Sequence, residues 1–85
     1  MEVGDWYREQ TFNKKNGKKE WKYYTIKNIT PENSTAEIDV YKIFHDKRIS
    51  GPKQYFSDME VFEKCTKVSA EYAHSRLKIK PPEKK

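Results

Sequence analysis

The sequence predicts a mainly β domain of the α+β class, with a small curled antiparallel sheet of three to five strands, a short helix and a C-terminal helix. Three observations predict this class. Aromatic and β-branched residues dominate two runs, 6–12 and 20–30, a composition typical of strands. Asn16-Gly17 separates these runs and favours a hairpin with a type I′ turn, because both residues tolerate positive φ. Helix caps are assigned at Ser57 and Ser69, late in the chain.

The size and composition limit the core that such a sheet can have. The chain has 85 residues, of which 34% are apolar and 36% are charged. Two Trp, six Tyr and four Phe compensate, because each aromatic side chain can bury roughly 150–250 Å². We therefore expect residues 1–80 to form a single small domain, and residues 81–85 to form a flexible basic tail.

Turn and periodicity signals predict the strands that follow the first hairpin. Residues 31–34 indicate a turn, because proline fixes φ and the Asn and Ser side chains bond to nearby backbone. Residues 36–41 alternate apolar and polar side chains, which predicts a half-buried strand. The alternation slips near Tyr41, which indicates a bulge. A short fourth strand is expected at residues 54–56.

Two helices are predicted after these strands. Ser57 and Glu60 have the spacing of a capping box, so a short helix is expected after Ser57, with Met59, Phe62 and Cys65 on its packed face. Residues 66–68 predict a last short strand. Ser69 is then expected to cap a second helix that runs from Ala70 to about Ile79.

The order of these segments resembles a known architecture. Val3-Gly4-Asp5-Trp6 precedes a meander, and residues 56–62 precede the closing segment 66–68. Over about residues 3–68, this layout is similar to the SH3-like barrels of small phage and mobile-element accessory proteins. The resemblance implies a closed or nearly closed sheet and a binding protein that is not an enzyme. It rests on topology, with no shared motif, so no functional residue carries over. An open sheet with both helices on one face is the alternative architecture.

The net charge of +5 is unevenly distributed. Residues 13–28 carry +5 and residues 76–85 carry +4, whereas residues 1–12 and 29–75 each carry −2. This asymmetry favours an anionic partner at a defined place, although lysines also crowd hairpin tips simply to keep them soluble. One cysteine excludes an intramolecular disulfide, and no apolar run approaches the roughly 20 residues of a membrane span. We expect a cytoplasmic protein that does not engage a membrane.

Catalysis is not expected from the residue pattern. The two histidines have no cysteine or serine at a spacing that implies a nucleophile and its base, and the glycines are dispersed. No cluster has metal-ligand spacing, so no cofactor is expected. One enzyme class stays open: a small basic ribonuclease toxin could use His74 with Arg76 and Lys78, although His74 and Arg76, two positions apart, face different sides of a helix.

The expected function is therefore non-enzymatic binding of RNA, single-stranded nucleic acid or a ribonucleoprotein, which would modulate another machine. Lysines of the first hairpin would contact phosphates, and an aromatic residue of the second strand would stack on unpaired bases. Lysine acts as a point charge, so sequence-specific base recognition is not expected. The candidate contact residues are Lys14, Lys15, Lys18, Lys19, Trp21, Lys22, Tyr23, Arg76, Lys78 and Lys80.

The rival function is a protein-binding module. A partner with a negative groove could receive the lysine-rich hairpin. Alternatively, an acidic face formed by Glu37, Asp39 and Asp46 could mimic phosphates and dock on a basic host nuclease. Phage inhibitors of host defence, including anti-CRISPR proteins, resemble this chain in size, surface charge and lack of an active site.

Overall fold

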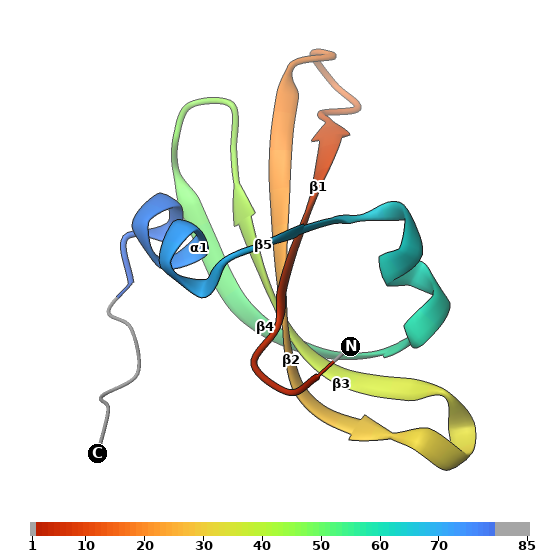
Figure 1. Ribbon diagram of the computed structural model, residues 1–85. Coiled ribbons are helices and arrows are strands. Elements are labelled where there is room, and N and C mark those ends of the chain that lie inside the picture. The colour runs from red at the N-terminus through yellow and green to blue at the C-terminus, as the bar shows by residue number, and fades with distance from the viewer. Residues whose placement is uncertain (1, 80–85) are drawn as a thin grey trace.

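The computed structural model of the chain describes residues 2–79, and its centre is an antiparallel sheet of five strands (Figure 1). The strand order is β4-β3-β2-β1-β5. The mainly β class with one C-terminal helix is confirmed. The predicted Lys80 contact and the tail at 81–85 lie outside the described residues. The strands are β1 (Trp6–Phe12), β2 (Lys19–Thr30), β3 (Thr35–Ile43), β4 (Ile49–Asp58) and β5 (Thr66–Val68).

The sheet is open, so the expected closure into a barrel is wrong. After β4, the chain passes through the 3₁₀ helix η2 (Met59–Lys64) and crosses one face of the sheet. It then pairs as β5 with β1, where Trp6 lies opposite Val68. β4 and β5 are therefore opposite edges, with no pairing between them in residues 2–79. Strand alternation is the same in open and closed sheets, so the sequence pattern could not distinguish them.

β4 is longer than the predicted strand at 54–56. Its pairing with β3 shifts register between Val40 and Lys42, which confirms the bulge expected near Tyr41. Gly51 lies opposite this bulge with φ +112°, and a Cβ at Gly51 would approach the Val40 carbonyl oxygen to 2.6 Å. Only glycine fits there without a backbone shift, which allows the strand to continue past the irregularity.

The two predicted helices differ in outcome. Ser69 Oγ accepts a hydrogen bond of 3.0 Å from the Tyr72 amide, so the expected cap of α1 (Ala70–Leu77) is confirmed. This helix ends before Ile79 because Lys78 adopts φ 56° and the Ile79 amide donates to the His74 carbonyl at 3.1 Å. The capping box at Ser57 is wrong: Ser57 belongs to β4, and η2 has no side-chain cap within the described residues.

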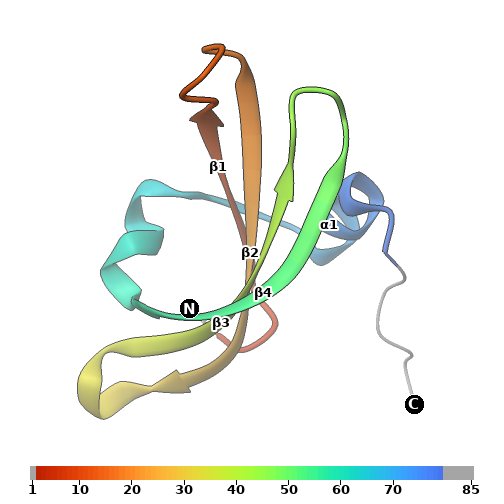
Figure 2. The ribbon, with the colours of Figure 1, turned by 180° about the vertical axis from the view of Figure 1, so that it is seen from behind.

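The two faces of the sheet carry separate apolar cores. Phe62 of η2 covers one face and packs with Tyr7, Tyr24 and Ile26. Ala73 and Leu77 of α1 cover the other face with Trp6 and Tyr23. Figure 2 shows α1 and the segment after β4 on opposite sides of the sheet. The open sheet of the alternative architecture is therefore confirmed, but its placement of both helices on one face is wrong. The shorter 3₁₀ helix η1 (Pro31–Asn33) joins β2 to β3. Within residues 2–79, no helix has the length and apolarity needed to cross a bilayer.

Candidate nucleic-acid interface

The loop of the first hairpin is ordered by asparagine side chains. It spans residues 13–18 between β1 and β2, and the Gly17 amide donates to the Asn13 carbonyl at 2.8 Å. Asn13 Oδ1 also accepts from the Lys15 amide at 2.8 Å and from the Asn16 amide at 3.3 Å. Gly17 has φ +69°, but Asn16 does not have positive φ, so the expected type I′ turn is wrong. The longer loop exposes its lysines.

A second basic hairpin lies at the same end of the sheet (Figure 1). Its loop joins β3 to β4, and the Phe44 amide donates to the Arg48 carbonyl at 2.8 Å. Asp46 Oδ1 accepts from the Arg48 amide at 3.1 Å. Lys47 and Arg48 are exposed. Sequence reasoning missed this loop as a candidate site, although its Lys47-Arg48 pair was a visible signal.

One buried carboxylate joins the two hairpins. Glu20 is only 1% exposed, and its Oε2 accepts from Asn13 Nδ2 of the first loop at 3.4 Å. The same oxygen lies 3.3 Å from both the backbone amide and Nδ1 of His45 in the second loop. Lys42 Nζ lies 3.3 Å from Oε1. Glu20 therefore fixes the two loops against each other.

The electrostatics of Glu20 favour its ionised form. Burial raises the pKa of a carboxyl group, but here hydrogen bonds from His45, Asn13 and Lys42 outweigh burial and lower the pKa to about 2. The carboxylate is thus an acceptor only, so His45 Nδ1 carries the hydrogen that it donates to Glu20. The charge of Glu20 is directed to groups inside the fold and not to solvent.

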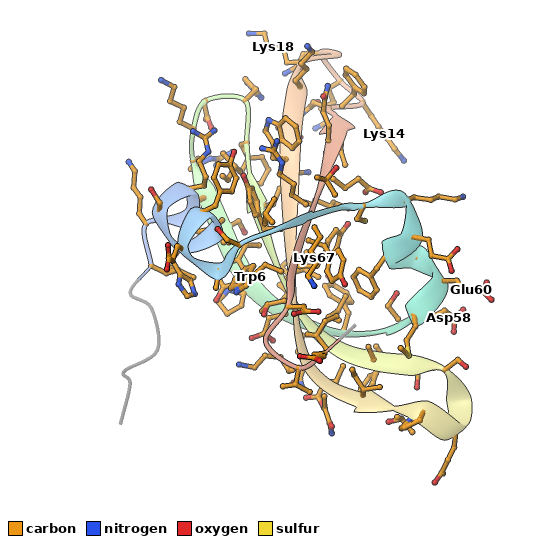
Figure 3. The ribbon with its side chains drawn as sticks, in the orientation of Figure 1. Trp6, Lys14, Lys18, Asp58, Glu60 and Lys67 are labelled. Atoms are coloured by element: carbon orange, nitrogen blue, oxygen red, sulfur yellow. The ribbon has the colours of Figure 1, made fainter. Side chains whose placement is uncertain are left out.

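The two hairpins hold more than the whole positive excess of the chain. We call residues 13–22 and 42–48 together the hairpin end. It contains eight basic and two acidic residues, a net charge of +6, whereas the full chain carries +5. The rest of the chain is therefore slightly negative. Figure 3 shows Lys14 and Lys18 projecting from the hairpin end, whereas Asp58 and Glu60 lie toward η2.

The structure separates the predicted contact residues into three groups. Lys14, Lys15, Lys18 and Lys19 are exposed at the hairpin end. Lys22 is half-buried on the face that η2 covers, because strand alternation places it with Tyr24. Arg76 and Lys78 are exposed, but they lie on and just after α1, beside the middle of the sheet (Figure 1). The structure therefore does not gather all of these residues at one site.

Of the two aromatic residues predicted to contact a partner, Tyr23 is buried and Trp21 is partly covered. Tyr23 is 0% exposed and packs under α1, so it is a core residue and not a contact. Trp21 is half-buried on the same face, and the Arg8 guanidinium lies 4.5 Å from its ring centroid. Part of the Trp21 ring is thus already covered by an internal cation–π contact.

A groove that sequence reasoning missed crosses the other face of the sheet. It has a volume of about 600 Å³ and lies over β2, β3 and β4, next to η2. Lysines and aromatic residues share its lining. The lining residues are Lys22, Tyr24, Ile38, Val40, Lys42, Phe44, Ser50, Gly51, Lys53, Tyr55, Phe56, Ser57 and Val61.

The groups considered for catalysis do not form one site. His74 is only 9% exposed, and its ring packs edge-on against Trp6 at 5.4 Å, whereas Arg76 is exposed. Burial, with a smaller effect of the Glu9 charge, raises the pKa of the Cys65 thiol, which disfavours the reactive thiolate. Residues 2–79 contain no group of three or more His, Cys, Asp or Glu side chains that could hold a metal ion.

Of the acidic residues considered as a phosphate mimic, Glu37 and Asp39 share one face of β3, whereas Asp46 lies in the loop of the second hairpin. Asp39 Oδ2 lies 3.9 Å from Lys27 Nζ, and Glu37 accepts a hydrogen bond from Gln54. Asp46 is in the second hairpin loop and lies 3.6 Å from Arg48. Each carboxylate has its own partner within the fold.

Comparisons of the chain with models of protein families, with curated proteins and with solved structures find no match. The similarity to SH3-like accessory proteins stays a prediction. Only the closure of the sheet that it implied is wrong, because the sheet is open.

Proposed function

We propose that the protein binds RNA or other single-stranded nucleic acid, alone or within a ribonucleoprotein, and thereby modulates another machine. The observation that carries this proposal is the hairpin end, where Glu20 joins two loops and the net charge is +6. Apart from residues 76–85, which carry +4, the rest of the chain is negative, and a strongly positive hairpin end on such a body attracts a polyanion in a preferred orientation. Neutralising phosphates releases counterions, which makes the resulting affinity strongly dependent on salt.

The composition of the hairpin end favours contact with the phosphate backbone over recognition of base sequence. The chain has fifteen lysines and only three arginines. A lysine ammonium contacts phosphate as a point charge, whereas bidentate recognition of guanine needs the planar arginine side chain. We therefore expect binding with little sequence preference.

A salt titration tests this proposal. Binding of the full chain to a fluorescently labelled single-stranded RNA is measured by anisotropy at several salt concentrations. We expect the logarithm of the affinity to fall linearly with the logarithm of the salt concentration. A protein that shows no binding even at the lowest salt concentration would refute the proposal and would favour a protein partner instead.

A further inference from the structure

We propose that the groove over β2, β3 and β4 receives unpaired bases, so that the protein prefers single strands to ligands that lack accessible bases. This inference rests on the proposed function and adds the class of nucleic acid that is bound. The groove has a volume of about 600 Å³, which is within the range of roughly 300–1,000 Å³ typical of sites for small organic groups. Three features of the groove support the proposal.

The first feature is an exposed aromatic pair on the edge strand. Tyr55 is 49% exposed and lies opposite Ile38, on the groove face of β4, whereas Phe56 is 77% exposed and borders the groove from the next position of this edge strand. Val61 of η2 is also exposed at the same groove. A small domain gains by burying such side chains, so adjacent exposed aromatics indicate a contact surface. Every base has a flat π face that can stack on an aromatic side chain.

The second feature is the charge of the groove. Lys22, Lys42 and Lys53 come from three adjacent strands, and all three line it. Lys22 lies directly opposite Lys42 in the register of β2 and β3, an arrangement of like charges that destabilises a sheet. Neighbouring acidic residues reduce this repulsion only in part. Lys42 forms an ion pair with Glu20, and Lys22 lies opposite Glu9 in the pairing of β1 with β2. None of the described residues that line the groove is acidic.

The third feature is continuity with the hairpin end. Phe44 lines the groove and also begins the loop of the second hairpin. Its ring centroid lies 4.9 Å from Lys42 Nζ and 4.6 Å from the Arg48 guanidinium carbon. A strand whose phosphates contact the hairpin end can thus lay adjacent bases along the groove toward Tyr55 and Phe56.

Charge complementarity favours a nucleic acid over the other occupants of such a groove. An apolar peptide or a second copy of the chain could pair with the free edge of β4. An apolar peptide carries no anions to pair with Lys22, Lys42 and Lys53. A second copy of the chain has a net positive charge and would also leave these lysines poorly neutralised. A single-stranded nucleic acid supplies both the anions and the flat apolar groups that this lining needs.

The experiment compares two probes of equal length and equal charge: a short single-stranded RNA and an oligomer of abasic sugar phosphates. The variants are Tyr55→Ala, Phe56→Ala and their combination. The matched control is Tyr72→Ala, which removes an exposed aromatic on α1. We expect the wild type to bind RNA more tightly than the abasic oligomer. Each groove substitution should weaken RNA binding by about tenfold and leave abasic binding unchanged.

The possible results separate this inference from the proposed function. Equal affinity of the wild type for both probes would overturn the groove inference and leave the phosphate-binding proposal intact. A preference for RNA that persists in the double variant would also overturn it, as would a matching loss in Tyr72→Ala. A wild-type dimer that Phe56→Ala dissociates in sedimentation would assign the groove to a second copy. Absence of binding to either probe would overturn both proposals.

Discussion

Removal of positive charge from the first hairpin loop should flatten the salt dependence of RNA binding. Lys14, Lys15 and Lys18 are exposed, and none forms an ion pair within residues 2–79. Their replacement by glutamine should therefore change the free energy of unfolding by less than about 0.5 kcal/mol. For single strands, each phosphate contact contributes about 0.7 to the slope of log affinity against log salt. Three lost contacts should reduce the slope by about 2.

This slope gives a measurable difference in affinity. Between about 50 and 200 mM salt, the wild type should lose roughly 15-fold more affinity than the triple glutamine variant. Fluorescence anisotropy with a labelled single-stranded RNA measures both slopes. The control is a second triple variant with the same change in net charge, Lys27→Gln, Lys64→Gln and Lys67→Gln, which lies away from the hairpin end. Equal slopes for the two variants would show that only net charge matters, and would refute a localised contact.

Two further predictions concern the fold that holds the site. Glu20→Gln removes a carboxylate whose pKa is about 2 in the folded protein and 4.5 ordinarily, so its stabilising effect is complete above about pH 4.5 and is lost as the pH falls toward 2. Urea unfolding should show a stability gap between the wild type and this variant that closes over that range; a gap independent of pH would contradict the role of the charge. Tyr23→Ala should lower the free energy of unfolding by about 3–5 kcal/mol, because the side chain is 0% exposed. Phe56→Ala should change it by no more than about 0.5 kcal/mol, and similar losses in thermal unfolding would show that Tyr23 is not a core residue.

Local patterns predicted those elements in which local and long-range preferences agree. The aromatic runs became β1 and β2, and the cap at Ser69 formed as expected. The pattern at Ser57 failed because strand pairing extends β4 through Asp58, opposite Thr35. The Met59 amide then donates to the Ser34 carbonyl at 2.9 Å. Strand pairing thus continues past Ser57, so the helix does not begin at the position that the capping box requires.

The site was predictable only where charge is concentrated in the sequence. The lysines of residues 13–19 stand out by number. The second loop contains Asp46 beside Lys47 and Arg48, so its net positive charge is small. Its position next to the first loop depends on the pairing of β2 with β3. The groove was hidden for a related reason. A phenylalanine is expected to be buried, whereas Phe56 is exposed on β4, an edge strand that pairs only with β3.

The role of Glu20 explains how so many like charges can share one end of a small fold. Two unit charges about 4 Å apart in water repel by about 1 kcal/mol, and by more near a protein surface. Glu20 opposes this repulsion from inside, because its carboxylate contacts Lys42 and His45 and also receives a bond from Asn13. Each of these partners belongs to or borders a hairpin loop. A single internal anion thus holds the two loops together while Lys14, Lys15 and Lys18 stay free to face a polyanion.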